Sequence, residues 1–328
     1  MSENEKYLRV WNDKFNSEGL NLSIEKIVRL VREDKDGLVF LVRRYGHINV
    51  YFLGTVILDY DGKHFTFNSE YIKYLPAGTA DLFPHKGRFL EFESWYNSLN
   101  DIKHAMHNRN KTSREKAAQQ AIMQAVNANP DSMYYIMDVE YDYPSIQCGR
   151  FDMIAVSKIP VNGKHKVAII ELKCGTESFR GSPTAANEYG SGIVGHALNL
   201  SRFINGTRDE KGTDAVRKRL SDLATELASA SNVCNRFALN PAPFLPALNK
   251  EDFDIDDIQT WLLCVGCKNP KTAEQGVLRY LGYPADGQKN NPNVKDNVTP
   301  DMKLHYKVTS ANCLESLHDS DFTDARNG

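Results

Sequence analysis

No segment of this chain of 328 residues approaches the run of about 18 apolar residues that a membrane-spanning helix requires. The first residues, MSENEKYLRVW, contain no apolar region of the kind that marks a signal peptide. Neither sign of charge dominates, since the formal net charge is −2 and the sequence pI is about 6.5. We therefore expect a cytoplasmic protein that does not bind membranes, and any contact with nucleic acid has to come from a local basic patch.

Cysteine does not occur before Cys148, and the six cysteines of the chain are irregularly spaced. This pattern is unlike a disulfide scaffold, so we expect reduced thiols. Cys264 and Cys267 form a C-x-x-C, but no second pair accompanies them, which favours buried thiols over a metal or iron–sulfur site. The sequence also contains no P-loop and no glycine fingerprint that opens a helix. These absences argue against a nucleotide-driven motor and a dinucleotide-using enzyme.

The length favours two domains, and the residue pattern changes near residue 110. Residues 1–110 are rich in aromatic side chains and alternate between apolar and polar positions, so we predict a small, mainly β N-terminal domain. Asp36-Gly37 and Asp61-Gly62 are pairs typical of hairpin turns.

Other local signals complete this N-terminal half. A helix is predicted at residues 23–33, and the polar residues 97–112 are predicted to be a connection. Recognition of a substrate is a candidate role for this half, because its aromatic residues and Arg43-Arg44 suit base stacking and phosphate contact, although core packing explains most such aromatic residues.

The second domain, residues 111–328, alternates between helical and extended patterns, which is typical of an α/β layer structure. The last residues, 315–328, resemble a frayed acidic tail. In chain order, the predicted elements are a helix at 112–129, strands at 133–143, 149–157 and 166–174, helices at 193–204 and 214–230, and a strand at 260–267.

Two adjacent strands at the centre of this domain carry charges inside apolar sequence. The first, GRFDMIAVS, contains Asp152, and the second, KVAIIELKC, contains Glu171 and Lys173. Residues two apart in a strand point to the same face, so Glu171 and Lys173 project together. Such charges are costly inside a buried strand unless they are paired or bind an ion. The sequence therefore predicts a site for a divalent cation, although exposed strands also carry Glu and Lys two apart as a salt-bridge ladder.

This order of elements, with Asp152 on the second strand and Glu-x-Lys on the third, resembles the PD-(D/E)xK nuclease superfamily over residues 112–268. The resemblance implies an α/β fold with a restriction-endonuclease-like αβββαβ core, in which helices flank a mixed central sheet. It places Asp152, Glu171 and Lys173 at the positions of the family's catalytic residues. Phe151 stands where the family has its proline, which weakens the match modestly.

The chemistry of phosphodiester hydrolysis gives an independent reason for these residue types. A carboxylate-bound Mg²⁺, with Mn²⁺ as a substitute, activates water and clamps the phosphate. Asp152 and Glu171 are the expected metal ligands. Lys173 is expected either to act on the attacking water or to stabilise charge on phosphorus, and sequence leaves both roles open. We expect the substrate to be nucleic acid, with DNA favoured.

Four further residues are candidates for the site. Glu115 is either a catalytic residue from the first helix or the partner of Thr112 in a capping box, and both interpretations remain open. His196, on the helix after the Glu-x-Lys strand, is a further catalytic candidate, although a lone helical histidine is more often structural. Arg180 and Ser182, in a glycine-rich stretch, are expected to contact the substrate phosphate.

A second hypothesis is a catalytically inactive nuclease-like scaffold that binds nucleic acid or protein in repair or phage defence. The intact Asp, Glu and Lys weigh against it, whereas the mild acidity of the chain weighs for it. The oligomeric state stays open, and a homodimer is one option.

Overall fold

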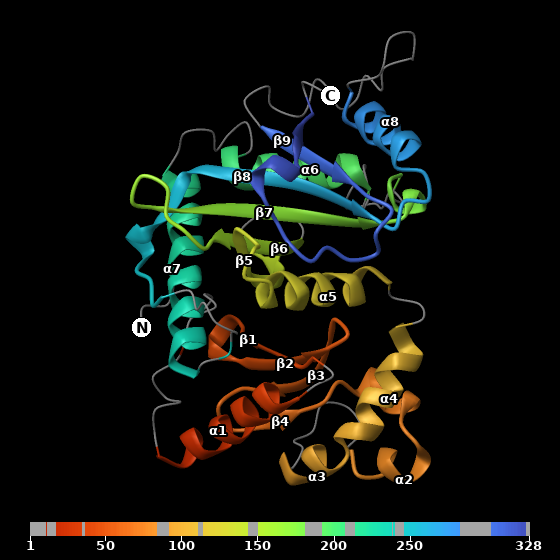
Figure 1. Cartoon of the computed structure of the whole chain (residues 1–328). Coiled ribbons are helices and arrows are strands. Elements are labelled where there is room, and N and C mark those ends of the chain that lie inside the picture. The colour runs from red at the N-terminus through yellow and green to blue at the C-terminus, as the bar shows by residue number, and fades with distance from the viewer. Residues whose placement is uncertain are drawn as a thin grey trace. The chain divides into compact units, whose positions relative to one another are not determined.

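The computed structural model describes residues 11, 18–34, 37–83, 92–110, 114–143, 150–180, 192–206, 214–237, 239, 246–282 and 303–325. Contacts within the chain divide it into two compact units (Figure 1). The N-terminal unit comprises Met1–Gln124 and Thr225–Leu248, and the second unit comprises Ala125–Ala224 and Asn249–Gly328. The division falls inside a helix rather than at residue 110, and it assigns the second half of a later helix to the N-terminal unit.

The N-terminal unit contains a four-stranded antiparallel sheet in the order β1-β2-β3-β4. The turn between β2 and β3 places Leu53 and Gly54 at φ 48° and 70°, a left-handed pair that matches the twist of a tight hairpin. Asp61-Gly62 lies in the hairpin between β3 and β4, as predicted. Its strands are β1 (Val39–Val42), β2 (Ile48–Phe52), β3 (Thr55–Tyr60) and β4 (Phe65–Thr66).

Two expectations for this unit were wrong. Gly37 lies between a helix and β1, so Asp36-Gly37 does not form a hairpin; Asp36 itself is outside the described residues. The polar stretch 97–112 is mostly helical, because Ile102, Ala105 and Met106 are fully buried at helical spacing. The unit is therefore less β-rich than predicted. Its helices are α1 (Glu18–Glu33), α2 (Ala77–Ala80), α3 (Phe92–Asn97) and α4 (Leu99–Asn110).

The second unit contains a mixed six-stranded sheet in the order β10-β9-β8-β7-β6-β5. Strands β5, β6 and β7 pair antiparallel, whereas β8 is parallel to both β7 and β9. The molecule is thus mixed α/β, as predicted. The strands are β5 (Tyr134–Asp142), β6 (Arg150–Ser157), β7 (His165–Cys174), β8 (Phe253–Val265), β9 (Leu304–Val308) and β10 (Thr323–Asp324).

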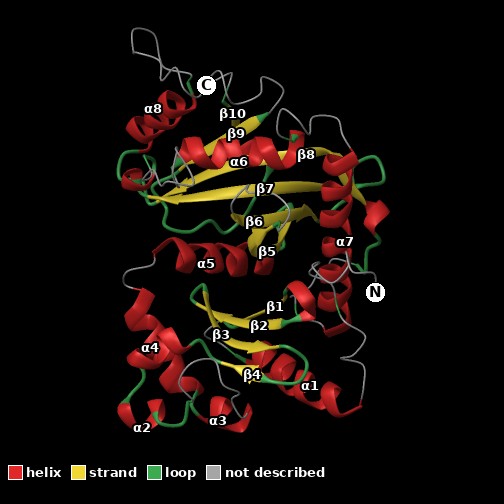
Figure 2. Ribbon diagram, turned by 180° about the vertical axis from the view of Figure 1, so that it is seen from behind, coloured by secondary structure: helices red, strands yellow, loops and turns green. Residues whose placement is uncertain are grey.

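Helices accompany this sheet in the predicted chain order. Helix α6 lies behind the sheet in Figure 1 and in front of it in Figure 2, so it covers one face. Helix α8 follows β8 and was not foreseen. The remaining helices are α5 (Arg114–Ala128), α6 (Ile193–Asn205), α7 (Asp214–Phe237) and α8 (Pro270–Leu281). No helix among the described residues is long and apolar enough to cross a membrane.

The C-terminal residues cover the opposite face of the sheet and are not a frayed tail. Leu317, Phe322 and Ala325 are buried, and the Phe322 ring stacks on Trp261 of β8 with centroids 4.3 Å apart. The main chain of Met133 donates a hydrogen bond to the carbonyl of Leu317. The many acidic residues of this segment made it resemble a tail in sequence, although its apolar residues pack on the sheet.

Candidate active site

Asp152 lies where strands β6 and β7 stop pairing. The recorded ladder ends at the pair Met153 and Ile170, and beyond it the Asp152 Oδ2 accepts a hydrogen bond of 2.7 Å from the main-chain N–H of Leu172. Because Asp152 follows the alternation of β6 and Glu171 that of β7, both project to the same side of the sheet. The carboxyl group of Asp152, which is 8% exposed, is thus anchored beside the Glu-x-Lys segment.

Glu171 and Lys173 are buried on that same face. Glu171 is 0% exposed and Lys173 is 2% exposed, while Ile170 and Leu172 between and beside them face the other way. An exposed salt-bridge ladder is therefore not the explanation for these two charges. The sequence prediction that they project together on a buried strand agrees with this geometry.

His196 reaches the same place from helix α6. Its Nδ1 atom lies 2.6 Å from Oε2 of Glu171, and its side chain is 14% exposed. At this distance the two groups attract when the imidazole is protonated, but their geometry is not that of a hydrogen bond. The helix that covers this face therefore brings an ionisable group directly to the Glu171 carboxylate.

Thiols line the far end of this face. Cys264 of β8 is the register partner of Lys173 in the parallel pair β7 and β8. Burial is the main cause that raises the pKa of Cys264, and Cys267 and Cys174 raise it further, whereas the nearby Lys173 lowers it. Burial also raises the pKa of Cys267. These thiols stay protonated, which agrees with the prediction of buried reduced cysteines; Cys148 is outside the described residues.

Glu140 is a neighbour of the site that the sequence analysis missed. It lies on β5 between Val139 and Tyr141, which pair with Met153 and Phe151 on either side of Asp152. Its φ is 52°, a left-handed conformation. For any residue other than glycine this conformation is destabilising inside a strand. Its Oε1 lies 3.3 Å from Nη2 of Arg150, which shares a strand face with Asp152. A backbone conformation of this kind leaves no signal in the amino-acid sequence.

For three predicted site residues, the described part of the chain shows no contact with this cluster. Glu115 lies half-buried in the first turn of α5, in the part of the helix that belongs to the N-terminal unit, and its role stays a prediction. The alternative capping partner, Thr112, lies outside the described residues. Arg180 is exposed and ends a described segment, and Ser182 also lies outside the described residues.

The carboxylates suit a hard cation with few protein ligands. Within the described part of the chain, no three His, Cys, Asp or Glu side chains form a cluster that could hold a metal alone. Mg²⁺ is usually held by one or two carboxylates, with water and substrate phosphate completing its octahedron, so Asp152 and Glu171 fit this ion. The contact with His196 occupies one oxygen of Glu171.

Comparisons with protein-family models, with curated proteins and with solved structures find no significant match. The geometry of the cluster is therefore the basis for any functional conclusion.

Proposed function

We propose that this protein is a metal-dependent nuclease of the PD-(D/E)xK type that hydrolyses phosphodiester bonds in nucleic acid, with DNA favoured. The observation that supports the proposal is the burial of Asp152, Glu171 and Lys173 on one face of two adjacent strands. The apolar interior makes three such charges costly unless they serve a function. The strand order and the helix that covers the charged face also suit a restriction-endonuclease-like core.

In this proposal, Asp152 and Glu171 hold Mg²⁺ or Mn²⁺, which when bound supplies an activated water and a clamp on the phosphate. The hydrogen bond from Leu172 fixes Asp152, so the first carboxylate is oriented before the ion arrives. Lys173 places a positive charge on the same face, where it stabilises negative charge on the phosphate. His196 lies against Oε2 of Glu171 and helps to hold this carboxylate in place. Arg180 and Ser182 remain the proposed contacts to the substrate phosphate.

A cleavage assay tests the proposal. Purified protein is incubated with single- and double-stranded DNA and with RNA, in Mg²⁺, in Mn²⁺ and in chelator. We expect metal-dependent cleavage that Glu171→Gln and Lys173→Met each reduce by about a thousandfold, because each removes a group that acts on the transition state. Lys166→Met is the matched control, since Lys166 lies on the same strand, faces the other way and bonds Asp319 at 2.6 Å.

The contact between His196 and Glu171 favours one alternative, a nuclease-like scaffold without catalysis. A protonated His196 would offset the charge of the buried Glu171 carboxylate without a metal. The scaffold predicts no metal-dependent cleavage by the wild-type protein and no metal-dependent rise in its melting temperature. Cleavage that persists unchanged in both Glu171→Gln and Lys173→Met would reject the proposed site.

A further inference from the structure

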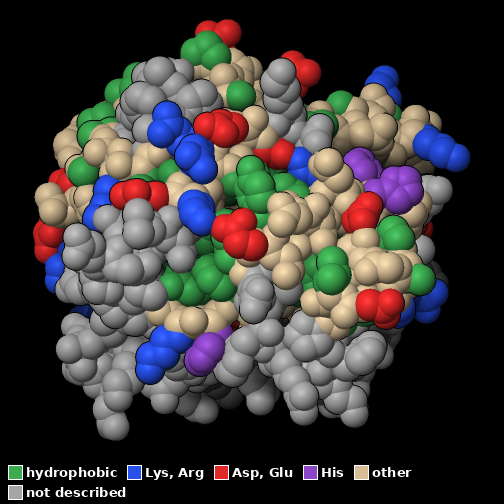
Figure 3. Space-filling view, turned by 90° about the horizontal axis from the view of Figure 1, so that it is seen from below, with side chains coloured by type: hydrophobic (Ala, Val, Ile, Leu, Met, Phe, Trp, Pro, Cys, Tyr) green, Lys and Arg blue, Asp and Glu red, His purple; other side chains and the backbone are tan. Residues whose placement is uncertain are grey.

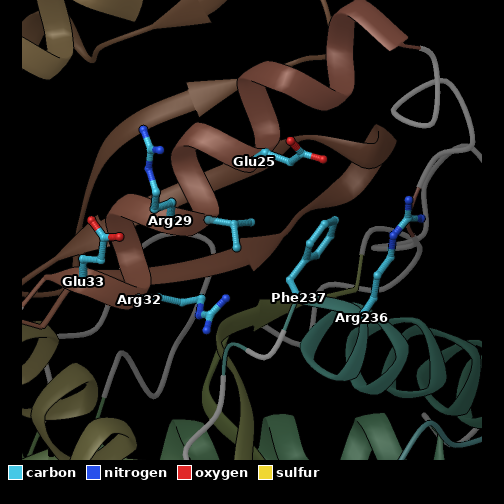
Figure 4. A pocket seen from close by; sticks show the side chains of 7 residues that line it. Glu25, Arg29, Arg32, Glu33, Arg236 and Phe237 are labelled. Carbon is cyan, nitrogen blue, oxygen red and sulfur yellow. The ribbon is translucent and has the colours of Figure 1, made fainter.

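A cleft in the N-terminal unit brings together two helices that are distant in sequence. The C-terminal end of α7 packs on this unit, since Val233 belongs to its apolar core and the Phe237 ring lies 6.4 Å from that of Phe40. Between this end of α7 and helix α1 lies a cleft of about 560 Å³ (Figure 4). Its lining comprises Glu25, Val28, Arg29, Arg32, Glu33, Arg236 and Phe237.

Two of the three arginines of the cleft are available to a ligand. Arg29 and Arg32 are exposed, and no described carboxylate lies within ion-pair distance of either one, although Glu25 and Glu33 share their helix. Arg43, by contrast, is buried and donates to the Tyr51 hydroxyl at 2.9 Å. Arg43 is therefore poorly placed for the phosphate contact predicted for Arg43-Arg44, whereas Arg29 and Arg32 of the cleft are better placed for it.

An aromatic floor lies between the two arginine-bearing helices. Figure 4 shows Phe237 between Arg32 of α1 and Arg236 of α7. The Arg236 guanidinium lies 5.2 Å from the Phe237 ring centroid and 5.6 Å from that of Trp11, so these rings hold the cation in place. The half-buried Phe237 ring also lies 5.3 Å from the Trp11 ring, and its remaining surface is one on which a planar aromatic group can stack.

The charges that line the cleft limit the class of ligand that can bind there. Three arginines and two glutamates leave one formal positive charge, which is too little for a polyphosphate but suits one phosphodiester. The two carboxylates accept hydrogen bonds from exocyclic amino groups, as acidic side chains do from cytosine. The face shown in Figure 3 intersperses charges of both signs, which agrees with recognition by a local site rather than by a broad basic surface.

We propose that this cleft binds one nucleotide of a single-stranded nucleic acid, with the base on Phe237 and its phosphate near Arg29 and Arg32. The volume lies in the range of ligand sites and suits a nucleotide. The choice of a strand over a free nucleotide rests on the proposed nuclease function. The cleft itself is independent of that function, because none of its residues belongs to the site on β6 and β7.

The test measures binding of the full-length protein to a short labelled single-stranded oligonucleotide by fluorescence anisotropy, in chelator so that no cleavage occurs. Arg29→Gln combined with Arg32→Gln is expected to weaken binding about tenfold and to lower the salt dependence by about two charges. Both side chains are exposed, so the fold should persist, and circular dichroism checks it. The matched control combines Arg217→Gln with Lys250→Gln, two cations that are exposed elsewhere and that should change affinity less than about twofold.

Phe237→Leu provides a second, independent variant. It keeps an apolar side chain and removes the stacking surface, so binding should weaken about tenfold while the salt dependence stays that of the wild type. Affinity of the arginine variant within twofold of the wild type, or an equal loss in the control, would overturn the proposal.

Competition identifies the source of the ligand. Mononucleotides and inorganic phosphate should displace the labelled strand only at much higher concentration, and duplex DNA should compete poorly. A mononucleotide or a duplex that competes as well as the strand would overturn the single-strand assignment. If the wild-type protein binds the strand but never cleaves it with metal, only the proposed nuclease function is contradicted. If the protein cleaves but the cleft variants bind as well as the wild type, only the proposed binding role of the cleft is contradicted.

Discussion

The two faces of the six-stranded sheet differ in chemistry although the same strands form both. Toward the C-terminal segment, Trp261 stacks on Phe322 and meets the ring of Tyr134 at 4.8 Å, edge to face. Toward α6, the same strands present Glu171 and Lys173, both buried. One face buries aromatic surface and stabilises the fold, whereas the other buries charge at a cost in stability. Successive side chains of strand β7 point alternately to the apolar face and to the charged face.

The largest effect is expected from removal of the segment that covers the apolar face. Truncation before Leu314 deletes the buried Leu314, Leu317 and Phe322 and uncovers Trp261. We expect a loss on the order of 5 kcal/mol or more in the free energy of unfolding, measured by chemical denaturation. Phe322→Leu, which keeps an apolar contact, should lose less than about 1.5 kcal/mol. A truncated chain that unfolds at the same denaturant concentration as the full chain would show that the segment is a tail after all.

Adjacent residues of β7 give the sharpest comparison of the two faces. Leu172→Ala leaves a cavity on the apolar face and should destabilise by about 2–5 kcal/mol. Lys173→Met removes a buried positive charge with little change in volume and takes it away from the buried carboxylates of Asp152 and Glu171. We therefore expect a loss of about 3 kcal/mol in chelator, partial recovery when Mg²⁺ replaces the lost charge, and loss of cleavage. Denaturation and cleavage assays on both variants measure the contrast. A loss of stability in Lys173→Met that Mg²⁺ does not relieve, as expected for Leu172→Ala, would mean that Lys173 serves structure rather than catalysis.

Much of the second unit could be predicted from sequence because its signals are local. Strands β6 and β7 are nearly continuous apolar runs in the sequence. Because side chains alternate between the faces of any strand, Glu171 and Lys173 are placed on one face. Helices α5, α6 and α7 follow from their 3.6-residue periodicity and agree with the structure within a few residues, apart from the longer C-terminal end of α7.

The features that sequence missed depend on contacts between distant residues. In sequence the C-terminal segment resembles a tail because polar residues separate Leu317 from Phe322, and only packing on the sheet shows that the two belong to one apolar surface. Helix α4 was hidden for the same reason. The cleft between α1 and α7 requires two helices about 200 residues apart in sequence to meet, and no periodicity encodes such a meeting.

A smaller effect is expected from the strained residue on the charged side of the sheet. Glu140→Gly removes the cost of a left-handed φ, about 1 kcal/mol, and loses an ion pair with the half-exposed Arg150 that is worth less than that. Stability should stay equal or rise slightly, while the metal concentration needed for cleavage increases if Glu140 supports the cation site. Glu140→Gln keeps the strain and removes the charge, so it should share only the metal effect. Lower stability with unchanged metal dependence in both variants would assign Glu140 a structural role.

The smallest expected effect is on the stability of the fold at acidic pH, through a residue of the C-terminal segment. Burial raises the pKa of Asp319, but hydrogen bonds from Lys166 and Tyr134 outweigh burial and lower it overall. A carboxyl group whose pKa is lower in the folded state stabilises the fold above its unfolded pKa of about 4, and this contribution is lost as the pH falls through the folded value. Because the Asp319 side chain is 40% exposed, solvent screening keeps the effect below about 1 kcal/mol. Asp319→Asn should therefore reduce the loss of stability below pH 4 and leave stability near pH 7 slightly lower. Chemical denaturation at a series of pH values measures both effects. If stability below pH 4 falls as steeply in the variant as in the wild type, another group is responsible for the loss.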